Sequence, residues 1–207
     1  MRSSLPSCAA IPHPGRCGVS SHAASVEAAL PTTISQRVLR EAFGTFATGV
    51  TVVTAIRPNG EPLGVTANSF TSVSLDPPLL LWCLAKSSSS VEAFALGAPF
   101  AVHILAHQQR DLALHFARRS REKFEIDRAW RSNPSPPQIA DALCRFDCRV
   151  HSLHSGGDHV IVVGEVLALQ RHSGLPLAFH GGHFGSLAAD KGSPQVDTWH
   201  AWHGEWV

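Results

Sequence analysis

The alternation of apolar and polar positions is clearest between residues 50 and 91. Over 63–68, apolar side chains recur at every second position, which is the pattern of a strand with one apolar face. A polar loop follows and ends at Asp76-Pro77-Pro78, because tandem prolines cannot donate the hydrogen bonds of a sheet. The next run, 79–85, is wholly apolar and far too short to span a membrane. We therefore predict two strands in this stretch, with the second one buried.

The patterns over the rest of the chain predict short strands, tight turns and few helices. Ser35 can cap a helix over 36–48, which has Val38 and Phe43 on one apolar face and which we expect to pack on the strands. Further helices are expected at 91–96 and 108–118. Strands are expected at 50–56, 100–106, 142–152, 159–170, 176–179 and 184–187. This order of elements predicts a mainly β fold, closed or nearly closed into a barrel, with peripheral helices.

Between the apolar run and the next helix lies a serine-rich segment, Lys86 followed by four serines. Ser89 and Glu92 have the spacing of a capping box, which predicts that the serines stand at a helix N-terminus. Backbone N–H groups, hydroxyls and a lysine at that place would suit a phosphate. A solvated linker with a helix cap is the alternative interpretation of the same residues.

Four separated motifs, taken together, resemble the flavin reductase-like family. They are GVTANSF at 64–70, SVSLDPPLLLWCLA at 72–85, KSSSS at 86–90 and Gly157-Asp158-His159. The resemblance runs from about Gln36 to Leu187. It implies an FMN-binding split β-barrel, Greek-key-like, with peripheral α-helices, of the kind that serves two-component monooxygenases.

The resemblance also implies a set of site residues. His159 is expected close to the reduced nicotinamide, as the catalytic residue, with Asp158 orienting the turn or the imidazole. The flavin ring edge would contact Thr66, Ala67, Asn68 and Ser69. The ribityl phosphate would contact Lys86, Ser87, Ser88 and Ser90. Lys123, Phe124 and Phe184 are weaker candidates for a place beside the flavin.

The implied activity is that of an NAD(P)H-dependent flavin reductase. It would transfer a hydride from NADH or NADPH to FMN or FAD and supply the reduced flavin to a separate monooxygenase. One alternative is a flavin-binding electron carrier on the same barrel without nicotinamide turnover, and another is an enzyme similar to pyridoxamine-phosphate oxidase. No Gly-x-Gly-x-x-Gly follows a strand, so a Rossmann nicotinamide site is not expected. The sequence does not separate FMN from FAD, or NADH from NADPH.

Composition narrows the classes of partner. Lys and Arg number 17 against 16 Asp and Glu, which gives no electrostatic reason to expect nucleic acid or an anionic membrane. Five cysteines without a CxxC pair favour a reducing compartment, so we predict a cytoplasmic protein. Of the 13 histidines, the closest pairs are His180/His183 and His200/His203, and neither has a cysteine or carboxylate at a familiar ligand spacing. No metal site is therefore predicted.

The chain divides into three parts by composition. Residues 1–34 are poor in acids and rich in Pro, Ser and Ala, so we expect a disordered or targeting-like extension. Residues 35–190 form the predicted split-barrel domain. Residues 191–207 form a tail rich in Trp and His, expected to dock on the barrel or on a partner subunit. The resemblance implies a homodimer with the flavin site near the subunit interface.

Overall fold

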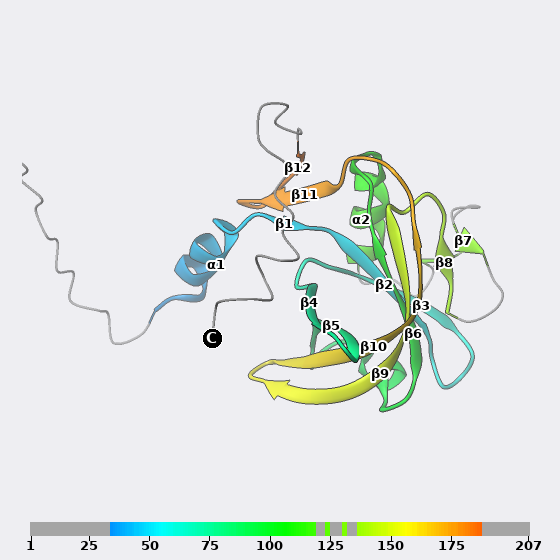
Figure 1. The fold of residues 1–207 in the computed structure, drawn as a ribbon. Coiled ribbons are helices and arrows are strands. Elements are labelled where there is room, and N and C mark those ends of the chain that lie inside the picture. Colours follow the sequence, from blue (N-terminus) through cyan, green and yellow to red (C-terminus); the bar gives the residue numbers. More distant parts are fainter. Residues whose placement is uncertain (1–33, 119–122, 125–129, 132–135, 188–207) are drawn as a thin grey trace, which may run out of the picture. The chain divides into compact units, whose positions relative to one another are not determined.

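The computed structural model describes residues 34–118, 123–124, 130–131 and 136–187. The extension predicted over 1–34, apart from Ile34, and the tail predicted over 191–207 lie outside these residues. The described part is mainly β, as predicted, with short helices at its edges (Figure 1). None of the described helices has the length and the hydrophobicity that a crossing of the bilayer requires.

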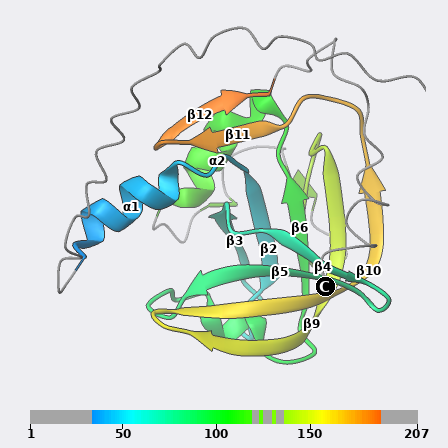
Figure 2. The ribbon, with the colours of Figure 1, turned by 60° about the vertical axis from the view of Figure 1, so that its left-hand side comes forward.

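The central feature is a seven-stranded antiparallel sheet in the order β3-β2-β6-β9-β10-β5-β4. The sheet curls, so that β5, β9 and β10 cross below the ends of β2 and β3 in Figure 2. Its strands are β2 (Thr51–Ile56), β3 (Pro62–Ala67), β4 (Thr71–Leu75), β5 (Pro78–Ala85), β6 (Pro99–Ile104), β9 (Cys144–Gly156) and β10 (His159–Arg171).

Smaller elements flank this sheet. One group forms the three-stranded sheet β1-β11-β12, and another forms the two-stranded sheet β7-β8. These strands are β1 (Thr48–Gly49), β7 (Trp130–Arg131), β8 (Gln138–Ile139), β11 (Leu177–His180) and β12 (His183–Ser186). The helices are α1 (Gln36–Gly44), α2 (Arg110–Ala117) and the 3₁₀ turns η1 (Val91–Phe94) and η2 (His107–Gln109).

The main core fills the concave side of the curled sheet. Along β5, residues 80, 82 and 84 are buried and their neighbours are half-exposed, which is the period-two pattern of a strand with one core face. Trp82 stands edge-on to Phe94, with ring centroids 4.9 Å apart, and Phe94 meets Phe100 in the same way at 5.9 Å. This aromatic row joins η1 to β5 and β6, so it also fixes where the serine-rich segment between β5 and η1 begins and ends.

Two local predictions were wrong. Residues 71–75, predicted to be a polar loop, form the edge strand β4, in which every residue except the half-buried Ser74 is exposed. An edge strand with one solvated face needs few apolar residues, which explains why it was missed. The capping box is not formed either. Ser90, not Ser89, precedes η1 and makes no side-chain cap, while Glu92 pairs with Arg57 at 3.2 Å.

The first helix also differs from its prediction. It ends at Gly44 rather than at residue 48, and none of its residues is buried. Its apolar positions include Val38, Phe43 and, just beyond the helix, Phe46; these are 46%, 73% and 77% exposed. The amphipathic pattern was correctly recognised, but Phe43 and Phe46 on the apolar side stay mostly exposed.

One buried polar group in the sheet has a consequence for stability. His103 on β6 is fully buried, and its Nδ1 lies 3.1 Å from the carbonyl oxygen of Val52. Burial lowers the pKa of His103 from 6.5 to about 4, the bond to Val52 opposes this effect, and the nearby Arg145 charge adds to it. The folded protein therefore holds this imidazole neutral at pH values where the unfolded chain would protonate it.

We expect stability to fall on acidification because of this histidine. The folded pKa lies below the unfolded one, so the stability is present above pH 6.5 and is lost as the pH falls towards 4. The loss between pH 7.5 and pH 5 should be about 2 kcal/mol. Urea unfolding of the wild type and of His103→Gln at both pH values measures it. A parallel loss of stability in the two proteins would assign the effect to other groups.

Candidate active site

A cavity of about 1050 Å³ opens at one end of the curled sheet. Three segments that are far apart in the sequence form most of its wall: β3 with the residues after it, the serine-rich segment after β5, and the end of α2 with Lys123 and Phe124. His159, the first residue of β10, completes the wall. A cavity of this size can hold a large planar ligand.

Most of the residues predicted for the site line this cavity. Those in the wall are Thr66, Ala67, Asn68, Ser69, Ser87, Ser88, Ser90, Lys123, Phe124 and His159. Lys86, Asp158 and Phe184 are not among the lining residues. Lys86 and Asp158 stand directly beside it, each next to a residue of the wall. Phe184 lies instead in a second apolar cluster, 5.2 Å from the ring of Phe179.

Two hydroxyl groups in the wall form hydrogen bonds within the protein. Thr66 donates from Oγ1 to the carbonyl oxygen of Ala113 at 2.7 Å, which holds α2 against β3. Ser69 accepts the backbone N–H of Cys83 at 2.9 Å, which ties the end of β3 to β5. These side chains therefore shape the wall, and a ligand would meet mainly the backbone of this segment and the amide of Asn68.

The serine-rich segment is folded by its own hydrogen bonds. The N–H of Ser88 donates to the carbonyl oxygen of Ala85 at 2.9 Å, and Ser88 Oγ accepts the N–H of Ser90 at 3.2 Å. Arg57, at the end of the β2–β3 hairpin, donates to the carbonyl oxygen of Ser89 and so holds the segment from the other side. Within the described residues, no hydrogen bond engages the N–H groups of Ser87 and Ser89, so they can still donate to a ligand.

Lys123 closes the wall between α2 and β3. Its ammonium donates to the carbonyl oxygens of Gly64 at 2.9 Å and of Phe116 at 2.7 Å. The pKa of Lys123 is lowered, first by burial and second by the positive charge of Arg57. Gly64 is required here, because a Cβ at this position would lie 2.4 Å from the Phe116 ring. The part of the wall between α2 and β3 is thus held by the Lys123 ammonium and by a close contact between the Gly64 backbone and the Phe116 ring.

His159 reaches the cavity through strand pairing. It stands opposite Ala85 on β5, so it lies next to the start of the serine-rich segment. Its Nδ1 is 2.8 Å from Oδ1 of Asp158, and its side chain is 43% exposed. This hydrogen bond is the main reason why the pKa of Asp158 is lowered. The imidazole is therefore oriented by the neighbouring carboxylate while one of its edges stays accessible.

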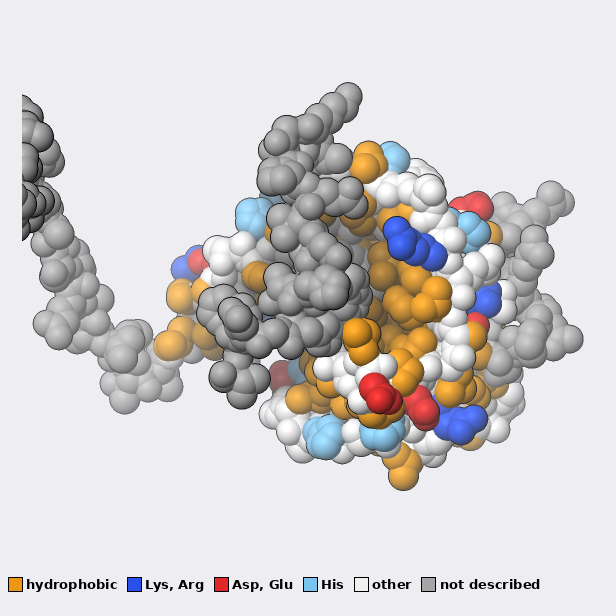
Figure 3. Space-filling model, in the orientation of Figure 1, with side chains coloured by type: hydrophobic (Ala, Val, Ile, Leu, Met, Phe, Trp, Pro, Cys, Tyr) orange, Lys and Arg blue, Asp and Glu red, His pale blue; other side chains and the backbone are white. Residues whose placement is uncertain are grey.

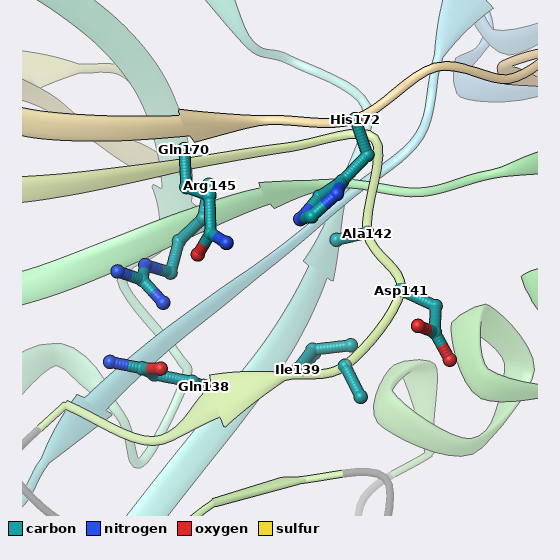
Figure 4. Close-up of a pocket in the computed structure, with 8 residues that line it drawn as sticks. Gln138, Ile139, Asp141, Ala142, Arg145, Gln170 and His172 are labelled. Atoms are coloured by element: carbon teal, nitrogen blue, oxygen red, sulfur yellow. The ribbon is translucent and has the colours of Figure 1, made fainter.

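A second, smaller cavity of about 240 Å³ lies elsewhere on the sheet (Figure 4). Gln138 and Ile139 of β8 face Arg145 and Gln170 of the neighbouring strands β9 and β10 across it. Arg145 forms an ion pair with Asp147 at 3.0 Å. Among the residues that the structure describes, no group of three or more His, Cys, Asp or Glu could hold a metal ion.

The lining residues that sequence reasoning did not assign to the site include Arg57, Cys83 and Arg118. Arg57 follows a strand immediately before a turn, where an arginine is ordinary and gives no signal. Cys83 was interpreted as a buried residue of an apolar run, yet it is half-buried and lies in the wall. Arg118 directly follows α2, and a basic residue at the end of a helix is ordinary. Arg57 could have been predicted from the position of the β2–β3 hairpin beside the serine-rich segment, but a single sequence does not reveal that position.

Comparison with known proteins shows which family the chain is similar to. The sequence profile described as the flavin reductase like domain matches residues 43–188. The chain is 48% identical over 160 residues to the FMN reductase (NADH) SmoA of Agrobacterium fabrum, covering 77% of this chain and 90% of that protein. It is also 48% identical over 131 residues to the reductase component of the flavin-dependent trigonelline monooxygenase of Acinetobacter baylyi. That match covers 63% of this chain but only 42% of that protein.

Solved structures lead to the same class of protein. The NADH:FAD oxidoreductase of Streptomyces globisporus, in complex with NAD and FAD fragments, superposes with a TM-score of 0.69 at 42% identity. That match covers 76% of this chain and 95% of the other. The mainly β, antiparallel fold is therefore that of solved flavin reductases. The chain belongs to the flavin reductase-like family.

Proposed function

We propose that the protein is an NAD(P)H-dependent flavin reductase that supplies reduced FMN or FAD to a separate monooxygenase. The observation that carries the proposal is one cavity whose wall unites the 66–69 segment, the serine-rich segment and His159. The relatives named above add support, since their names state flavin reduction by NADH and a reductase component of a monooxygenase.

The donors in the wall suit a flavin. Asn68 and the backbone of 66–69 offer hydrogen bonds to a polar ring edge. The hydroxyls of the serine-rich segment, the N–H groups of Ser87 and Ser89, and the Arg57 charge suit a phosphate. When bound, the flavin would supply a ring that accepts the hydride. We assign Ser87, Ser88 and Ser90 to the phosphate end and add Arg57 to them.

The protein's own part in the reaction is positioning. Hydride transfer to a flavin requires no protein nucleophile, only reacting atoms held at about 3–3.5 Å. His159 is proposed to hold the nicotinamide against the flavin, with Asp158 keeping its imidazole in place at 2.8 Å. Lys123 and Phe124 are proposed to close the far side of the ring's pocket. Phe184 does not line the cavity, but it packs against the apolar cluster that also holds Phe116 and Phe124 of the wall, so its place beside the flavin stays a prediction.

The test is an activity assay with a binding control. Purified protein is mixed with NADH or NADPH and with FMN or FAD, and the nicotinamide absorbance is followed. We expect rapid oxidation that requires added or bound flavin, and the four combinations identify the preferred pair. Flavin binding without oxidation of either nicotinamide would contradict the reductase and favour an electron carrier.

We also propose that the protein is a homodimer, as the resemblance implied. The uncovered apolar face of α1 supports this proposal, because Phe43 and Phe46 are mostly exposed within one chain. Hydrophobic side chains also gather in the middle of the surface seen in Figure 3. Light scattering of the purified protein measures the mass, and a monomer at micromolar concentration would contradict the proposal. The domain over 35–190 and the cytoplasmic location stay predictions.

A further inference from the structure

Lys86 lies beside the cavity but directs its ammonium elsewhere. Nζ donates to Oγ of Ser155 and to the carbonyl oxygen of Gly157, both at 2.7 Å. The backbone N–H of Lys86 donates to the carbonyl oxygen of Asp158 at 2.9 Å. Three hydrogen bonds from one residue thus converge on the turn between β9 and β10. Two of the three N–H donors of the ammonium are therefore used within the chain.

This turn lies at the far end of the β9–β10 hairpin. β9 bonds to β6 and to residues 97–98 only as far as Val150, so beyond that point β10 is its one neighbour among the described strands, while β10 also pairs with β5 up to His159. The turn contains Gly156 and Gly157, and Gly157 has a φ of 64°, a conformation that glycine adopts without strain. Lys86 follows β5, so its side chain must pass the start of β10 to reach Ser155 on β9. It therefore links three strands at the end of the hairpin.

The residue that follows the turn is His159. Its backbone begins β10, and its side chain faces the cavity beside Ala85. The bonds from Lys86 end on Gly157 and Asp158, the two residues just before it. Any movement of the turn would displace the imidazole from the wall, and displacements of about 1 Å can cost roughly 100-fold in rate.

We propose that Lys86 is a positioning residue that locks the β9–β10 turn and thereby places His159, instead of binding the flavin phosphate. The proposal rests on the nicotinamide-side role proposed for His159. It makes Lys86 and Ser155 a functional pair, although neither side chain lines the cavity.

Lys86→Met tests whether Lys86 fixes the β9–β10 turn, because methionine lacks the ammonium group but keeps an unbranched side chain. We expect kcat/KM for the nicotinamide to fall about tenfold, which corresponds to about 1.4 kcal/mol, with flavin affinity changed less than about twofold. Hydrogen exchange at the amides of 155–160 should become faster in the variant without nicotinamide or flavin. Arg149→Met, an exposed cation on β9, is the matched control for loss of charge and should change neither measurement.

A double-mutant cycle with Ser155→Ala separates the two roles of Lys86. If Lys86 acts through the turn, the double variant should be no worse than Lys86→Met, because the two changes break the same contact. Loss of flavin affinity in Lys86→Met with a silent Ser155→Ala would overturn the proposal in favour of a phosphate ligand. Unchanged hydrogen exchange at the amides of the turn in Lys86→Met would also overturn the proposal. A different result is possible for His159 alone. If His159→Ala leaves the nicotinamide kinetics unchanged while hydrogen exchange in the turn still becomes faster in Lys86→Met, the role proposed for His159 is wrong, but Lys86 still fixes the turn.

Discussion

Replacement of His159 by alanine is expected to lower kcat/KM for the nicotinamide about 100-fold while flavin affinity stays within about twofold. The reason is its place in the wall, opposite Ala85 at the start of the serine-rich segment. Because hydride transfer depends on the approach of two rings, loss of the group that orients one of them acts on rate more than on flavin binding. Steady-state kinetics and flavin fluorescence titration measure the two quantities separately.

His154→Ala is the matched control for this variant. His154 lies on the same hairpin, is exposed, and its Nε2 lies 2.9 Å from Ser152 Oγ, but it does not line the cavity. Its replacement should leave both kcat/KM and flavin affinity unchanged. Equal losses in the two variants would show a general effect on the hairpin. A wild-type rate in His159→Ala would remove His159 from the proposed mechanism.

Trp82→Ala should cost about 3–5 kcal/mol in the free energy of unfolding. Trp82 is fully buried on β5, and its ring meets Phe94 edge-on at 4.9 Å. Removal of the ring leaves a cavity below the segment that carries the serines, so flavin affinity should fall as well. Urea unfolding monitored by circular dichroism measures the stability.

Two other variants control for the removal of apolar surface. Trp82→Phe keeps a ring, and the indole Nε1 is buried without a partner among the described residues, so no described hydrogen bond is broken. Its cost should stay below about 1.5 kcal/mol. Leu96→Ala, at a position 73% exposed, should change stability by less than about 0.5 kcal/mol. A similar cost for Trp82→Ala and Leu96→Ala would contradict the assignment of Trp82 to the core.

Most of the longer strands were predictable from the sequence, but the edge strand β4 was not. Alternation placed β3, and the apolar run placed β5 within one residue of its observed start. The final hairpin, β11 and β12, was also found, because Gly181 and Gly182 mark its turn. These features follow from side-chain periodicity and turn residues, which act locally. Their assembly into one cavity followed from the resemblance, since no local rule pairs residue 66 with residue 159.

The contacts within the site were not predictable from residue type. A lysine beside four serines indicates a phosphate, yet in the fold Lys86 bonds to a turn about 70 residues away in the sequence. Thr66 and Ser69 were chosen for their hydroxyls, and those hydroxyls hold strands and a helix. Nothing in the sequence indicated that Arg57 lies in the site. Which group a polar side chain binds depends on the register of strands that are remote in the sequence.

The internal bonding of the wall bears on how a reductase could exchange its flavin. Thr66, Ser69 and Lys123 have their partners within the chain, so the departure of a ligand leaves these three groups satisfied. If these groups needed a ligand as their hydrogen-bond partner, the empty pocket would contain unsatisfied polar groups and the ligand would be held more tightly. The shape of this part of the wall therefore depends on contacts within the chain and not on a bound flavin.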